Sequence, residues 1–174
     1  MSVIRFSYAK PTVVKSPDDK RVQMKVVYYC YGGTHSSVTA ASLHLGLLAK
    51  NRLPTAQELL SCPYFDRLTA RDYGKIFFMG RDSRGCEVYV MGCRDAGLLV
   101  ETALKEFCRI MQVNNRPVTL VNTKPCLNIL MRVGGFLSRR LNLITLGRLF
   151  LFPGIRLAFK QIGRVVDAVK IKGE

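Results

Sequence analysis

A thiol, an imidazole and three hydroxyl groups stand together between residues 30 and 37, in the stretch Cys-Tyr-Gly-Gly-Thr-His-Ser-Ser. Two adjacent glycines allow the main chain to take positive φ and to come close to a ligand. Hydroxyl groups can donate hydrogen bonds to an anion. These residue types predict a turn that binds phosphate or carboxylate. We assign ligand binding to Gly32, Gly33, Thr34, Ser36 and Ser37.

Cys30 and His35 are the groups of this turn that could react, and we treat both as candidate catalytic residues. The amino end of a helix favours the thiolate form of a cysteine, so Cys30 could act as a nucleophile. The alternative is an inert buried cysteine at the end of a strand. His35 could serve as acid, base or transient phosphoryl acceptor, or it could only hydrogen-bond the turn.

The elements around the turn place it at the edge of a sheet. Val22 to Cys30 lacks breakers and is rich in strand-forming residues, which predicts a buried strand. A helix follows to about Lys50, with Ser36 or Ser37 as its N-cap. Ligands of open α/β sheets bind beyond the carboxyl ends of strands, where unpaired helix amides suit an anion. A tight connection without a ligand is the alternative.

The rest of the chain alternates between helical and strand patterns. We expect a short helix capped by Thr55, then a hairpin, two further helices on either side of a strand, and a final helix. The hairpin strands are residues 75–80 and 87–92, and the last strand is 117–123; the later helices are about 95–113, 127–141 and 155–169. This order predicts a three-layer, Rossmann-like α/β domain with a mixed, mainly parallel sheet and one hairpin. The first and last strands should be parallel neighbours.

Residues 1–21 read as an N-terminal extension, and residues 22–174 as a single α/β domain with a basic, amphipathic C-terminal helical region. The 27 Lys and Arg against 12 Asp and Glu leave a net charge of +15, which attracts phosphates, nucleic acid or anionic lipid. Nucleic acid is an unlikely partner, because no nucleic-acid motif and no aromatic interleaving is present.

No secretory leader is visible, so we expect a cytoplasmic protein with reduced cysteines, peripheral to the membrane at most.

The basic carboxyl-terminal third supports two interpretations. Nine Lys or Arg stand against Asp167 and Glu174 from residue 132 onward. Arg139 and Arg140 either complete the anion site or belong to a solvated helix face. The last helix either covers its own sheet or places a basic, apolar surface on an anionic membrane or a protein partner, which is the alternative, noncatalytic function.

Cofactors and oligomeric state are not indicated. The six cysteines lack zinc spacing, so no metal ligands are assigned. A magnesium ion could accompany a bound phosphate through Ser37 or Asp82, although no acidic cluster demands one.

Two resemblances add to these expectations. The turn resembles the phosphate loop of low-molecular-weight tyrosine phosphatases, with Cys30 at the nucleophile and Ser37 at the following serine; Ser36 replaces the arginine of that loop. Residues 28–48, 77–92 and 133–148, in that order, resemble an uncharacterised family found mainly in Firmicutes, over a span of residues 23–150. The resemblance implies a single domain and carries no established activity.

Overall fold

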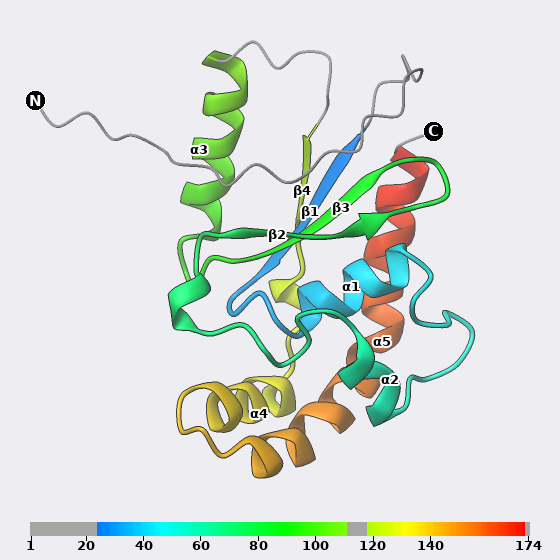
Figure 1. The fold of residues 1–174 in the computed structure, drawn as a ribbon, viewed down its shortest axis with the longest axis vertical. Helices are drawn as coiled ribbons and strands as arrows, with labels where there is room; N and C mark the ends of the chain where they lie inside the picture. The colour runs from blue at the N-terminus through cyan, green and yellow to red at the C-terminus, as the bar shows by residue number, and fades with distance from the viewer. Residues whose placement is uncertain (1–23, 111–117, 173–174) are drawn as a thin grey trace, which may run out of the picture.

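Four strands form one sheet in the order β2-β3-β1-β4 (Figure 1). The computed structural model describes residues 24–110 and 118–172. β1 (Lys25–Cys30) runs parallel to both β3 (Glu87–Gly92) and β4 (Val118–Asn122), and β2 (Ile76–Arg81) pairs antiparallel with β3. The sheet is therefore mixed and mainly parallel, and the predicted pairing of the first and last strands is confirmed.

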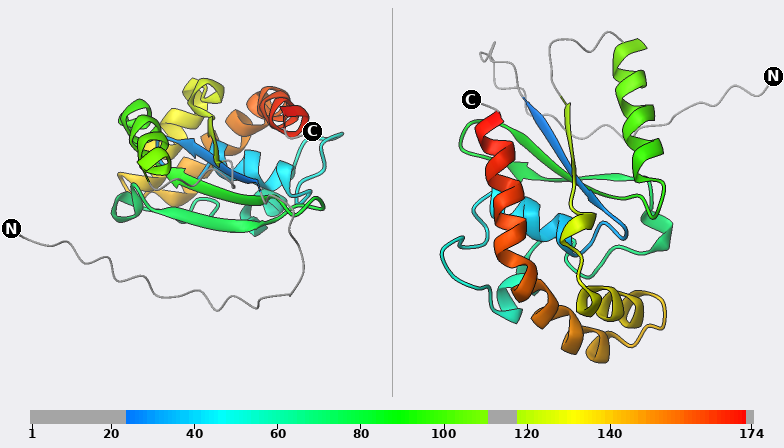
Figure 2. Two further views of the ribbon diagram at one scale, coloured as in Figure 1. Left: turned by 90° about the horizontal axis from the view of Figure 1, so that it is seen from above. Right: turned by 180° about the vertical axis from the view of Figure 1, so that it is seen from behind.

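Helices cover both faces of this sheet. They are α1 (Ser36–His44), α2 (Ala56–Ser61), α3 (Gly97–Ile110), α4 (Ile129–Arg139) and α5 (Ile144–Lys172), with 3-10 turns at Ala70–Asp72 and Lys124–Cys126. Val26 and Tyr28 of β1 pack into the core shared with α1 and α5. Val27 and Tyr29 point to the other face, where α3 packs (Figure 2). Alternate side chains of β1 thus pack into two different cores, one on each face of the sheet. The three-layer architecture is confirmed.

α1 is shorter and more buried than the sequence predicts. All nine of its residues are buried, and it ends at His44 rather than near Lys50. Gly46 takes φ of +73°, while its amide bonds the Leu43 carbonyl and the next amide bonds the Ser42 carbonyl. This is a Schellman ending, which stops the helix at a left-handed glycine.

The predicted serine cap is also wrong, because Ser36 and Ser37 are the first two helical residues. The preceding residue, His35, supplies no side-chain cap. Thr55, in contrast, caps α2 as predicted, in a capping box with Glu58.

α5 is a single 29-residue helix that includes Pro153, whereas the pattern predicted a helix only from Ile155. Its apolar stripe is buried against the sheet side of the protein, as one of the two interpretations expected: Leu151, Ile155, Ala158, Phe159, Ile162, Val166 and Val169 are all buried. Arg156, Lys160 and Arg164 stay exposed on the opposite side. None of the helices in the described residues is long and apolar enough to cross a membrane.

α4 and the first turns of α5 cross closely beyond the carboxyl edge of the sheet (Figure 1). A Cβ on Gly134 would lie 2.6 Å from the Gly147 carbonyl oxygen, and one on Gly147 would lie 2.7 Å from that of Gly134. The two glycines therefore let the helix backbones touch. The predicted extension 1–21 and the end of the third helix near Val113 lie outside the described residues.

Candidate functional site

The turn after β1 lies at the topological switch point of the sheet. β1 and β3 are adjacent and parallel, but α1 follows β1 on one face while α3 follows β3 on the other. Connections that leave adjacent strands in opposite directions open a crevice at their carboxyl ends, where ligands of α/β folds bind. The predicted location of the turn, Cys30 to Ser37, is correct.

The glycines of the turn pack against the end of β3. Gly33 has φ of +72°, and a Cβ there would lie 2.4 Å from the Gly92 nitrogen. Cys93 and Arg94 donate main-chain hydrogen bonds to the carbonyls of Cys30 and Tyr31, at 3.1 and 2.9 Å. Gly33 is therefore required by the close approach of two main chains.

The hydroxyl groups of the turn bond within the protein. Thr34 Oγ1 donates to the Tyr64 carbonyl at 2.6 Å and accepts from the amides of Arg67 and Leu68. Ser36 Oγ lies 3.1 Å from Thr123 Oγ1, at the end of β4. The side chains thus tie the turn to the segment after α2 and to β4, and they do not point to solvent.

The first amides of α1 remain available. Within the described part of the chain, the main-chain N–H groups of Ser36, Ser37 and Val38 have no protein acceptor, as expected for the start of a helix. Both serines are fully buried, so these amides lie beneath the surface of the turn. Gly32 of the same turn is only partly buried.

The sulfur of Cys30 is held inside the turn. The Gly33 amide donates to Sγ at 3.1 Å, and Ser37 Oγ lies 3.2 Å away. Cys30 is 2% exposed. The predicted nucleophile and the following serine are in contact, and solvent does not reach the thiol.

His35 belongs to a buried charged cluster around Asp66, which pattern reasoning did not select. His35 Nε2 lies 3.2 Å from Asp66 Oδ1, and Ser138 Oγ donates to the same oxygen at 2.7 Å. Arg139 Nε lies 3.1 Å from Oδ1, and Arg148 Nε donates to Oδ2 at 2.9 Å. One carboxylate therefore contacts two guanidinium groups and an imidazole.

The protein keeps Asp66 ionised although its carboxylate is fully buried. Burial by itself raises the pKa of Asp66, but hydrogen bonds from His35, Ser138 and Arg148 outweigh it and lower the pKa to about 2. Arg139 and Arg148 keep side-chain exposures of 21% and 35%. Both arginine side chains are therefore partly open to solvent.

A second group of side chains surrounds Tyr73, whose ring lies beside Tyr31 of the turn. Its ring lies 6.4 Å from the Tyr31 ring, and the Arg94 guanidinium lies 5.7 Å from its centre. Burial raises the pKa of Tyr73, and the charges of Arg94 and Arg140 oppose the rise. Tyr73 also sits beside the end of β3, in a bridge to Gly92. Tyr31, Tyr73 and Arg94 thus meet at this edge, and Arg140 is near enough for its charge to act on Tyr73.

The sequence predictions place some of these residues and miss others. Arg139 lies in the Asp66 cluster, and Arg140 is exposed beside Tyr73. Arg94 follows a strand end, a signal that could have selected it. Asp66 and Tyr73 come from an irregular segment whose position only the folded chain reveals.

Arg81 and Asp82 lie at the opposite end of the sheet, because β2 runs antiparallel to β3 and Arg81 pairs with Glu87 at the start of β3. Asp82 therefore lies away from the turn and cannot hold a magnesium ion on a phosphate bound there.

A family model matches residues 25–171, so the match continues past residue 150, where the sequence resemblance ends. The family is described as a protein of unknown function, DUF3189. The chain belongs to this family. The predicted membership of an uncharacterised family is confirmed, and the DUF3189 match includes the site and both helices that cover it. Searches of curated proteins and of solved structures found no match.

Proposed function

We propose that this DUF3189 protein binds a phosphate-containing small molecule or nucleotide at the carboxyl edge of its sheet. The observation that supports the proposal is the excess of guanidinium groups around the switch point. Arg139 and Arg148 share the single carboxylate of Asp66. Arg94 and Arg140 add two further cations around Tyr73. Partly exposed arginine side chains in excess over carboxylates favour a phosphate guest.

The site offers complementary groups for the parts of a nucleotide. The planar guanidinium groups can take phosphate oxygens in pairs of parallel hydrogen bonds. Tyr31, which is 36% exposed, and Tyr73 offer ring faces to a base. The amides of Ser36 and Ser37 lie deeper, at the positive end of α1, and would donate hydrogen bonds to a phosphate oxygen that reaches them.

Cys30 and His35 are the groups through which such a site could carry out phosphoryl or hydrolytic chemistry. The Gly33 amide and the Ser37 hydroxyl can stabilise a Cys30 thiolate. Asp66 orients the His35 ring. The turn lacks an arginine of its own, and Arg139 of α4 would supply the missing guanidinium. Because Cys30 is buried, such a reaction also requires the turn to open.

A thermal-shift screen tests ligand binding. Wild type, Arg94→Gln, Arg140→Gln and Arg164→Gln are melted with inorganic phosphate, pyrophosphate and a nucleotide panel. Arg164 is an exposed arginine of α5 and serves as the control for loss of charge alone. At least one compound should raise the Tm of wild type and of the control by about 5 °C at saturation, and this rise should shrink in the two site variants. Equal responses in all four proteins would refute the site.

The alternative function, an interaction through the basic, apolar C-terminal region, is supported by a different surface. α4 and the first half of α5 lie at the end of the molecule beyond the sheet (Figure 1). They expose several large apolar side chains: Ile129, Val133, Phe136, Leu146, Leu149 and Leu157. Residues 107–166 contain no Asp or Glu. Exposed apolar side chains among cations are typical of surfaces that bind anionic lipid.

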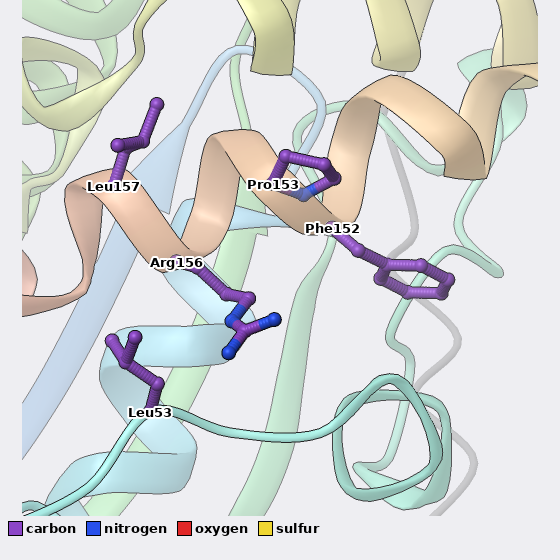
Figure 3. A pocket seen from close by; sticks show the side chains of 5 residues that line it. All are labelled: Leu53, Phe152, Pro153, Arg156 and Leu157. Atoms are coloured by element: carbon purple, nitrogen blue, oxygen red, sulfur yellow. The ribbon is translucent and has the colours of Figure 1, made fainter.

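A shallow hollow of about 410 Å³ continues this surface along α5. Figure 3 shows Phe152, Pro153, Arg156 and Leu157 of α5 together with Leu53, which precedes α2. The hollow is lined by apolar groups and one guanidinium, which can accept part of an acyl chain beside a lipid phosphate.

Vesicle flotation tests this alternative with a matched pair of variants. Wild type should float with phosphatidylglycerol-containing vesicles and not with purely zwitterionic ones, and salt should weaken binding. Phe136→Asp should abolish flotation. Leu99→Asp, which alters an apolar residue on α3 that is even more exposed than Phe136, should not. Flotation that survives Phe136→Asp, or is lost equally in both variants, would count against the α4–α5 surface.

A further inference from the structure

Three side chains with different donor atoms converge at the end of the sheet opposite the switch point. His44 at the end of α1, with Asp82 and Cys86 from the turn between β2 and β3, place their nitrogen, oxygen and sulfur atoms within 4.8 Å of one another. Figure 1 shows the end of α1 beside this turn. The His44 side chain is fully buried, that of Asp82 is 4% exposed, and Cys86 is buried.

We propose that His44, Asp82 and Cys86 bind a divalent transition metal ion of the zinc type. Zinc takes imidazole, carboxylate and thiolate ligands in one site, whereas calcium and magnesium prefer oxygen alone. Three protein ligands would leave a fourth position for water. The ion would carry two positive charges, which the carboxylate and the thiolate together balance.

The imidazole is held for ligation by a second residue. Tyr28 Oη lies 2.8 Å from His44 Nδ1, and His44 Nε2 lies 3.2 Å from Asp82 Oδ2. Metal-binding histidines are usually oriented in this way, by a hydrogen bond to the ring nitrogen that does not touch the ion. On binding, Nε2 would face the ion, Nδ1–H would donate to the Tyr28 oxygen, and the Cys86 thiol would release its proton to solvent.

The other two ligands are fixed by their turn. Asp82 Oδ1 accepts hydrogen bonds from the amides of Arg84 and Cys86, both at 2.9 Å. The Asp82 amide bonds the Cys86 carbonyl at 3.0 Å, and Gly85 takes φ of +82° to close the turn. These bonds leave Oδ2 of Asp82 directed at His44, so the ligand set needs little rearrangement.

Two cations border the site and set its affinity. Arg84 Nε lies 3.8 Å from Asp82 Oδ2, and the Arg84 guanidinium also donates to the Lys170 carbonyl at 3.2 Å. The Lys170 side chain adds a second positive charge near His44. Arg84 would compete with the ion for Asp82.

Cobalt titration of the full chain tests the site. Metal-free wild type should bind one Co²⁺ with the near-ultraviolet absorption of a thiolate–cobalt bond, and Zn²⁺ should displace it. Cys86→Ser should lose this absorption and bind at least about tenfold more weakly. Cys126→Ser, a buried cysteine elsewhere in the same core, should behave as wild type.

A further variant keeps the proposal testable if Cys86→Ser folds poorly. Arg84→Gln removes the competing cation and should tighten cobalt binding severalfold. Absence of the absorption in wild type, its persistence in Cys86→Ser, or equal loss in Cys126→Ser would overturn the proposal. These readouts do not depend on the phosphate site, because they are spectroscopic and concern the other end of the sheet.

Discussion

Gly33 and Gly92 pack main chain against main chain, so that a Cβ on Gly33 would lie 2.4 Å from the Gly92 nitrogen. This contact brings the turn after β1 against the end of β3 and thereby shapes the switch point. Glycine is needed here for two reasons, a positive φ and the absence of space.

Gly33→Ala should therefore destabilise the protein by about 3–5 kcal/mol, because the strain of positive φ adds to a backbone clash. Gly74→Ala is the matched control, since Gly74 has φ of +79° but no atom within 4 Å of its Cβ position. The control should cost only about 1–2 kcal/mol. Urea unfolding of both variants measures the difference, and equal losses would show that the Gly92 contact does not matter.

Acid unfolding should depend on Asp66. Its folded-state pKa of about 2 lies below the ordinary value of 3.8, so the unfolded chain binds the proton more tightly. The carboxylate therefore stabilises the fold above about pH 4, and this contribution, on the order of 2 kcal/mol, is lost as the pH falls toward 2. Asp66→Asn should lose stability at pH 7 and show a flatter stability curve between pH 4 and 2. A curve as steep as that of wild type would contradict the cluster.

The crossing of α4 and α5 should tolerate no side chain at Gly147. Gly147→Ala would place a methyl group 2.7 Å from Ser138 and the Gly134 carbonyl, at a cost of about 2–4 kcal/mol. Gly163→Ala, in the same helix with no atom within 4 Å, should instead stabilise by about 0.5–1 kcal/mol through helix propensity. Thermal unfolding compares them. Because α4 carries Arg139 and Arg140, Gly147→Ala should also weaken any phosphate response, whereas Gly163→Ala should not.

Thiol labelling should separate the cysteines by burial. Cys108 on α3 is partly exposed, whereas Cys30, Cys62, Cys86, Cys93 and Cys126 are buried. Native protein should therefore take up iodoacetamide first at Cys108, as read by peptide mass spectrometry. Rapid labelling of Cys30 in Cys108→Ser would show instead that the turn opens in solution, the movement that a reaction at Cys30 requires.

Local patterns determined much of this molecule. The alternation of β1, the turn chemistry between β2 and β3, and the apolar stripe of α5 each follow from interactions between residues close in sequence, so strands, hairpin and layers were predictable. The turn at Cys30–Ser37 was found for the same reason. The ends of the helices were less predictable. α1 stops early because Gly46 takes a left-handed conformation, and α5 continues through Pro153 because packing against α4 outweighs the local break.

Only the tertiary structure decided which side chains meet. Asp66, Arg139 and Arg148 are separated by up to 82 residues, and no periodicity links an irregular segment to two helices. His44, Asp82 and Cys86 likewise come together because α1 ends beside a hairpin turn. A sequence encodes periodicity and turn chemistry over a few residues, but the meeting of distant charges and ligands depends on how buried surfaces pack. Folding alone places the carboxylate of Asp66 between two arginines.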